Sequence, residues 1–212
     1  DAAGTVLTSA PGKVKGSSMP LTDVDAWDQY YGVQTPLKRF AESGTLFGHF
    51  GTETDLDSAI RRSPLLIRLV EPPGLYPSLA LQTAAQQLDA LVVPVIDQKE
   101  LLAVELRGPK TVSIPIENES PFMLINYPGP ASAFQRLSIV DAYDNTFDKQ
   151  QVAGKALLAG VTITGSMGDQ RVTPFSEFSP GIYTHAAVLS NILTGDFLSR
   201  PGGGVWTELA LM

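Results

Sequence analysis

One stretch of this chain, residues 154–198, constrains the fold more than any other, because an apolar run, a polar loop and an amphipathic segment follow one another in it. Residues 155–161 are almost continuously apolar, as expected of a strand that is covered on both faces of a sheet. The segment 183–193 carries apolar residues at three- and four-residue spacing, and Gly195 follows as a stop signal, which predicts an amphipathic helix. The spaced positions are Ala186, Leu189 and Leu193.

Shorter elements are expected on both sides of this stretch. Turn residues and apolar periodicity predict strands at 5–9, 45–51, 59–70, 101–106, 111–116 and 122–127, and helices at 36–42 and 76–91. Pro64 places its strand at an edge or a bulge. The turn at 107–110 favours a hairpin between its neighbours, and the Ser138 hydroxyl favours a helix start. The expected fold is therefore a single α/β domain, with a mixed β-sheet flanked by helices and a central strand at about 155–161.

The charge and the amino-acid composition of the chain limit the kinds of molecule that it can bind. The 212 residues carry a formal net charge of -7, so nucleic acid and anionic membrane surfaces are poor partners, and a small molecule or another protein fits better. The absence of cysteine excludes thiolate nucleophiles and cysteine metal sites. The two histidines, His49 and His185, lie far apart in sequence without a metal-binding pattern around either. No metal and no cofactor is expected, and no apolar run is long enough to span a bilayer.

A catalytic constellation remains as an alternative. Ser166, Asp169 and His185 are the only trio that suggests a hydrolase. A nucleophile elbow has glycine two residues before and after the serine, whereas Thr164 precedes Ser166 at that distance. The stretch also lacks the phosphate-binding glycine pattern around Lys155. The sequence thus favours a protein without a catalytic residue, with the hydrolase as the alternative.

Several polar residues are candidates for ligand contacts. Arg61 and Arg62 could bind an anion, although neighbouring strand residues point to opposite faces, which favours structural pairing with Asp55, Asp57 or Glu53. Four more candidates follow predicted strands or lie in the first turn of a predicted helix, where ligands of open α/β sheets bind. They are Asn126, Tyr127, Asp169 and His185. Each of these four side chains either contacts a ligand or belongs to a hydrogen-bond network that fixes the loops.

Four stretches together resemble a known family. They are Asp57 to Arg62 followed by Pro64-Leu65, with Ser58 where the family usually has Gly; Tyr76 to Leu81; Asn126 to Pro130; and Gly154-Lys155 with Gly168-Asp169, Thr173-Pro174, Pro180-Gly181 and His185-Ala186. This spacing resembles the CHASE2 family, whose members are extracytoplasmic sensor domains of bacterial transmembrane receptors. The resemblance runs from about residue 4 to the C-terminus. The strands with which such domains ordinarily begin are missing from this chain.

The resemblance implies a sensor that is not itself an enzyme. We expect an N-terminally truncated CHASE2-like domain at 1–199, and a linker at 200–212 that leads to a transmembrane segment outside this chain and then to a cyclase or kinase. An unidentified small-molecule ligand would contact Asn126, Tyr127, Asp169, His185 and Arg62, and the domain would form a homodimer in the periplasm or at the cell surface. Besides the hydrolase, a purely structural dimerisation module is the remaining alternative.

Overall fold

The structure is a computed structural model that describes residues 29–32, 46–71, 73–97, 100–117, 120–162 and 169–199. The predicted strand at 5–9, the predicted helix at 36–42, Ser166 and the predicted linker at 200–212 lie outside these residues. The domain boundary at 199 stays a prediction.

The described residues form three α-helices, two short 3₁₀ turns and ten strands, so the α/β class is confirmed. The helices are α2 (Leu79–Gln87), α3 (Ile139–Tyr143) and α4 (Ile182–Thr194). The strands are β1 (Gln29–Tyr30), β2 (Arg62–Pro64), β3 (Leu66–Leu69), β4 (Gly74–Pro77), β5 (Leu91–Asp97), β6 (Glu100–Arg107), β7 (Val112–Pro115), β8 (Phe122–Leu124), β9 (Gln170–Thr173) and β10 (Ser176–Pro180).

These strands are distributed over small sheets rather than one large one. Among the described residues, β1-β3-β4 and β5-β6-β7 are three-stranded, while β2-β8 and β9-β10 are pairs. Strand β1 runs parallel to β3, and the other neighbours within these sheets are antiparallel. Single bridges between Ala59 and Val172 and between Leu124 and Leu198 connect segments that are distant in sequence. Through these bridges the 59–62 segment, β8, β9 and the end of the described chain meet.

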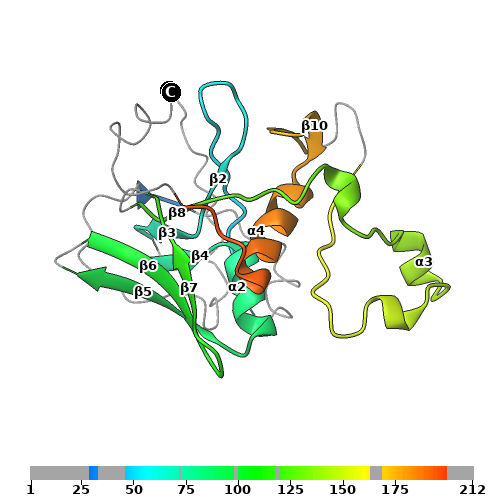
Figure 1. Cartoon of the computed structure of the whole chain (residues 1–212), viewed down its shortest axis with the longest axis horizontal. Helices are drawn as coiled ribbons and strands as arrows, with labels where there is room; N and C mark the ends of the chain where they lie inside the picture. The colour runs from blue at the N-terminus through cyan, green and yellow to red at the C-terminus, as the bar shows by residue number, and fades with distance from the viewer. Residues whose placement is uncertain are drawn as a thin grey trace.

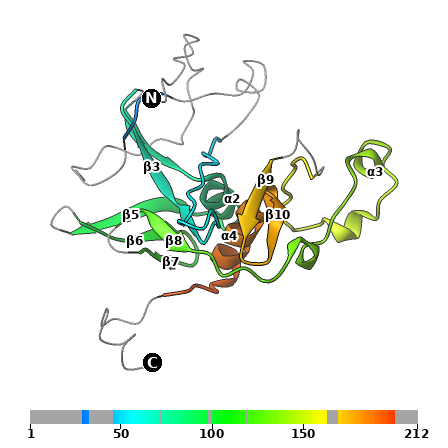
Figure 2. The same cartoon turned by 90° about the horizontal axis from the view of Figure 1, so that it is seen from above.

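Helices α2 and α4 lie side by side and form the centre of the core (Figures 1 and 2). Small residues on α2, among them Ala80 and Ala84, let the two helices approach closely, and Ala187 and Val188 of α4 are completely buried. The side chains buried around them include Ile60, Leu65, Leu66, Leu75, Leu81, Leu101, Val104, Leu106, Ile114, Met123 and Ile192.

Helix α4 confirms the prediction for 183–193, although its buried face is wider than the predicted stripe. It ends at Gly195, which adopts a left-handed conformation with φ of 72°. Leu193 of the predicted stripe is exposed, whereas Thr184, Val188, Asn191 and Ile192 are buried. The buried face includes Leu189 of the predicted stripe and three polar residues, Thr184, His185 and Asn191, which a count of apolar positions does not reveal.

The prediction of a central strand at 155–161 is wrong. This segment forms no strand pairing with the described residues, and Leu157 and Val161 are 64% and 57% exposed. Ala156 and Leu158 pack against the core, so only one side of the segment is covered. At Gly160, a side chain would collide with Ile182, the first residue of α4. The apolar composition therefore reflects a close passage along α4 rather than burial inside a sheet.

Two other predictions change in their extent, and a third is confirmed. The expected helix at 76–91 is shorter, because Tyr76 and Pro77 belong to β4 and Ser78 caps α2 through Leu81 N–H. The 59–70 strand divides at Leu65 into β2 and β3. The hairpin is confirmed as β6–β7. Strand β5 had not been expected because it contains Pro94, which an edge strand tolerates.

The segment that contains α3 stands away from the rest of the described chain in both views (Figures 1 and 2). Its helix begins after Ser138, whose hydroxyl accepts a hydrogen bond from Val140 N–H as predicted. None of its residues is buried, and Ile139 and Tyr143 are largely exposed. It therefore contributes little to the core.

Candidate functional site

The candidate site lies at the start of α4, where the chain enters the helix from β10. The Gly181 amide donates a hydrogen bond to the Asp169 carbonyl at 2.7 Å. The Asp169 carboxylate occupies the space in which a side chain at position 181 would lie. Gly181 is thus needed for the close approach of two residues from separate predicted motifs, Asp169 and Gly181 itself.

His185 lies one turn into α4 and is only 8% exposed. Burial lowers the pKa of the His185 imidazole, the Asp169 carboxylate opposes this shift, and the Arg171 guanidinium lowers the pKa further. Asp169 and Arg171 form an ion pair at 2.7 Å in which both side chains are about half exposed. The charges of Asp169 and Arg171 therefore both act on His185, and Arg171 is a neighbour that the sequence did not indicate. A contact of these residues with a ligand stays a prediction. The imidazole is neutral at pH 7.

His49 was missed as a neighbour of this site. Its charge and that of His185 act on each other although 136 positions separate them in the sequence. Burial lowers the pKa of His49 to about 4, like-charge repulsion from His185 lowers it as well, and a hydrogen bond with the Leu65 backbone acts in the opposite direction. Only the fold brings the two histidines close, since neither sequence pattern nor spacing relates them.

The backbone of His49 attaches its segment to the start of α2. The His49 amide donates to the Pro77 carbonyl at 3.0 Å, and the Leu79 amide donates to the His49 carbonyl at 2.7 Å. A side chain at Gly48 would overlap the backbone of Ser78 and Leu79. The segment 46–50 therefore lies tightly against the first turn of α2.

Tyr127 belongs to a hydrogen-bond network that fixes the loop after β8. Its hydroxyl donates to the Ile60 carbonyl at 3.0 Å and lies 3.4 Å from the Thr184 hydroxyl of α4. Its ring meets the ring of Phe175 edge to face. Burial raises the pKa of the Tyr127 hydroxyl. Tyr127 thus connects the 59–62 segment to the first turn of α4.

Asn126 is held through its backbone by a buried residue of α4. The Asn191 side chain donates to the Asn126 carbonyl at 2.8 Å and accepts from the Asn126 amide at 2.9 Å. Asn191 is 3% exposed. This paired contact replaces the hydrogen bonds that a neighbouring strand would supply. Of the four clustered candidates, Asn126 and Tyr127 therefore position the loop, whereas His185 and Asp169 line the start of the helix.

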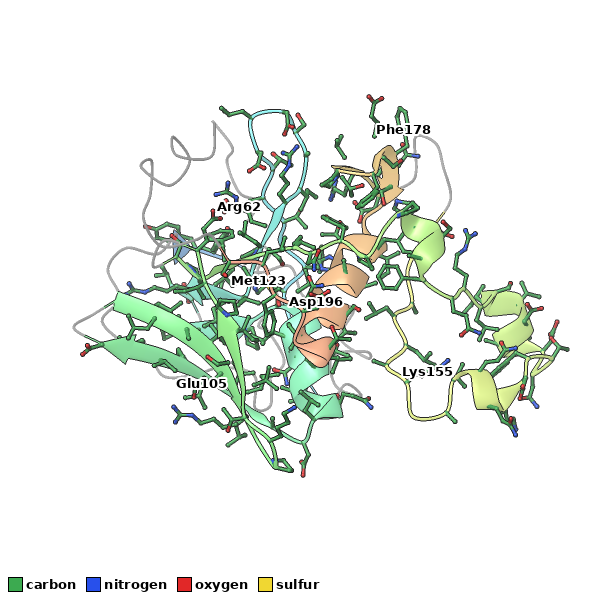
Figure 3. The ribbon with its side chains drawn as sticks, in the orientation of Figure 1. Arg62, Glu105, Met123, Lys155, Phe178 and Asp196 are labelled. Atoms are coloured by element: carbon green, nitrogen blue, oxygen red, sulfur yellow. The ribbon has the colours of Figure 1, made fainter. Side chains whose placement is uncertain are left out.

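Arg62 belongs to a different cluster. Its guanidinium contacts Asp55 at 2.9 Å and Glu117 at 3.6 Å, and Figure 3 shows it on the side of β2 opposite α4. Arg61 contacts Asp55 and Asp57 at 2.9 and 2.7 Å. Hydrogen bonds from Arg61 lower the pKa of Asp57 to about 2. The interpretation of both arginines as structural ion-pair partners is confirmed, and a role of Arg62 in ligand binding stays a prediction.

Two kinds of site receive no support from this geometry. Ser166, the nucleophile of the hydrolase alternative, lies outside the described residues, so the trio cannot be assembled from them. The described residues also contain no group of three or more His, Cys, Asp or Glu side chains that could hold a metal ion. Nor is any helix in this part of the chain both long and apolar enough to cross a membrane.

A family model for the CHASE2 domain matches residues 9–212. The chain belongs to the CHASE2 family. CHASE2 domains are extracytoplasmic sensory domains and are not catalytic. No curated protein and no solved structure matches this chain.

The fold shows the conformational cost of one departure of this CHASE2 domain from the family pattern. Ser58, which stands where the family usually has Gly, adopts φ of 65°. A glycine adopts this left-handed conformation at little cost, whereas a serine pays about 1–2 kcal/mol. The turn from Asp55 to Ser58, closed by the Ser58 amide on the Asp55 carbonyl, places Arg61 and Arg62 beside their acidic partners.

Proposed function

We propose that this CHASE2 domain is the extracytoplasmic, ligand-sensing part of a bacterial transmembrane receptor and that its ligand binds at the start of α4. The observation that carries the proposal is the convergence of Asp169, Arg171 and His185 beside the first turn of that helix. The ion pair is half exposed and offers both charges to a ligand. Such a surface suits a small polar molecule that carries an acidic or a basic group.

Asn126 and Tyr127 would contribute to this binding site indirectly, by holding the residues around it in place. Both are engaged in hydrogen bonds to the protein, so their contribution is to hold the loop and α4 in register. A ligand that moves the first turn of α4 also strains the Tyr127 contacts with Ile60 and Thr184. Ligand binding would in this way shift the balance between two arrangements of the domain.

In the proposed mechanism, a conformational change at the ligand site is transmitted along α4 to the segment that follows it. The helix runs over 13 residues, which is about 20 Å, from the candidate site to Gly195. Beyond it, Leu198 pairs with Leu124 of β8. We expect the parent protein to continue into transmembrane segments and a cyclase or kinase, and to act as a homodimer. The open reading frame of the parent protein tests this continuation.

A thermal-shift screen of small polar compounds, namely amino acids, carboxylic acids, phosphate and sugars, tests the ligand site at pH 7.5. A ligand at one hundred times its Kd stabilises by about 2.7 kcal/mol. This corresponds to a rise in Tm of roughly 5–11 °C for a domain of this size. The rise should be lost in Asp169→Asn and kept in the matched control Asp144→Asn, whose side chain lies at the end of the exposed helix α3.

Two results would contradict the proposal. A ligand whose Tm shift is the same in wild type, Asp169→Asn and His185→Gln binds elsewhere. If a compound of the screen is instead hydrolysed by wild type and not by Asp169→Asn, while the melting curve is unchanged, the hydrolase alternative with Ser166, Asp169 and His185 replaces the sensor.

A further inference from the structure

The charges of the two histidines act on each other within the part of the chain that the structure describes, where His185 is buried and His49 is partly exposed with its Nε2 atom buried. His185 projects from α4, and His49 comes from the segment attached to the first turn of α2. Helices α2 and α4 pack together, and neither contains an Asp, Glu, Lys or Arg. The charged groups that act on the pair are Asp169 and Arg171 beside His185. His49 has no carboxylate among the groups that act on it.

Protonation of this pair is therefore costly for the folded state. Two like charges would face each other at a site where burial already disfavours each of them. The Nε2 atom of His49 is buried without a well-formed hydrogen bond, and the Leu65 backbone, which raises the pKa of His49, is the smallest of the three influences on it. Asp169 compensates His185 in part, and its ion pair with Arg171 reduces this compensation.

We propose that this domain responds to acidification, because protonation of His49 and His185 loosens the attachment of residues 46–50 to the start of α2. The inference rests on the proposed sensing function and adds a second stimulus at the same site, since His185 lies at both. The hydrogen bonds that hold the segment are those between His49 and Pro77 and between Leu79 and His49. These two bonds are expected to open first when the pair is charged.

The direction of the pH dependence follows from the lowered pKa of both imidazoles. An unfolded or opened chain has histidines with a pKa of about 6.5 and binds protons that the closed state with a His49 pKa of about 4 rejects. The closed state is therefore fully stable above about pH 6.5 and is weakened as the pH falls toward 4. At pH 5, His49 alone shifts the equilibrium toward opening by about thirty-fold, and His185 adds to this.

Among the residues that the structure describes, the other groups with a shifted pKa do not titrate in this range. Asp57 has a pKa lowered to about 2, so its contribution is lost only below about pH 4. The pKa values of Tyr76 and Tyr127 are raised above 10 and affect only alkaline solutions. A change in the opening equilibrium between pH 7.5 and pH 5 consequently reports the protonation of the two histidines.

Native-state hydrogen exchange of the Leu79 amide between pH 7.5 and pH 5 tests the proposal on the full chain. After correction for the intrinsic exchange rate, the opening constant of wild type should rise by about thirty-fold or more. The rise should shrink in His49→Gln and disappear in the double variant His49→Gln/His185→Gln. Arg171→Gln should move the midpoint of the change to higher pH, and Asp169→Asn should move it to lower pH.

A wild-type opening constant that changes less than threefold would overturn the proposal, as would a double variant with the full wild-type rise. If the variants fail to fold, NMR titration of the wild-type imidazoles decides: titration of His49 near pH 4 supports the proposal, and titration near 6.5 overturns it. Ligand stabilisation at pH 7.5 in His49→Gln reports on the proposed ligand site separately, because both histidines are neutral there.

Discussion

The contact between Asn191 and Asn126 gives the sharpest prediction for the stability of this domain. Asn191 lies in the core stripe of α4, and its side chain makes two hydrogen bonds to the backbone of the loop after β8. The substitution Asn191→Ala removes both bonds and leaves the Asn126 amide and carbonyl without their partner. It also leaves a small cavity beside the helix, since the side chain is 3% exposed.

The expected loss can be worked out from these contacts. Each hydrogen bond contributes about 1 kcal/mol, and partly buried backbone groups without a partner cost about 1 kcal/mol more in total. The free energy of unfolding should therefore fall by about 3 kcal/mol. For a domain of this size, this corresponds to a decrease in Tm of roughly 6–12 °C.

Thermal and urea unfolding at pH 7.5 measure this loss, with Ser190→Ala as the matched control. Ser190 is the neighbouring residue on the same helix and is only half-buried, so its substitution should change stability by no more than about 0.5 kcal/mol. An Asn191→Ala variant that melts within 2 °C of the Ser190→Ala variant would refute the reasoning.

The substitution Asn191→Asp adds a test of the bonding pattern itself. A carboxylate at this position still accepts from the Asn126 amide but repels the Asn126 carbonyl, to which Asn191 donates at 2.8 Å. Once protonated, the new carboxyl group can donate again. Its pKa should be raised in the folded state, so the stability difference from wild type should shrink as the pH falls from 7 to 4. A difference that is constant with pH would contradict the proposed donor.

Three further substitutions follow from the geometry. Tyr127→Phe removes the hydrogen bond to the Ile60 carbonyl and should lower stability by about 1 kcal/mol in a urea melt, whereas an unchanged midpoint would contradict this bond. Ser58→Gly relieves the left-handed conformation and should leave Tm unchanged or raise it by up to about 4 °C; a clear decrease would contradict the turn. Gly48→Ala would overlap the backbone at Leu79 and should cost more than about 2 kcal/mol, measured by the same melt against Gly32→Ala, which has open space.

The sequence predicts those parts of the fold that depend on neighbouring residues. The cap at Ser138, the stop at Gly195 and the hairpin of β6 and β7 follow from side chains that act on the backbone a few positions away. The run at 155–161 shows the opposite case. Its composition is that of a buried strand, but the fold supplies no neighbouring strand among the described residues, and only one side is covered.

The candidate site was predictable only in part for the same reason. Asp169 and His185 were found because their motifs flank one helix, whereas His49 acts on His185 only through a charge interaction across 136 positions. The role of Asn191 depends on a loop 65 positions earlier, which no periodicity along the helix relates to it. Such residues become visible only when the fold shows which backbone groups lack a partner.

The left-handed turn at Gly195 has a consequence for how the proposed receptor would transmit a signal. After this turn the chain returns to β8, so Leu198 pairs with Leu124 while Asn191 holds Asn126. The end of α4 and the exit of the chain are thus tied to the same three residues of β8 and its loop. A piston movement of α4 along its own axis would shear both connections at once. A rotation that carries α4, β8 and the exit as one rigid lever breaks neither, and it is the mechanically favoured motion.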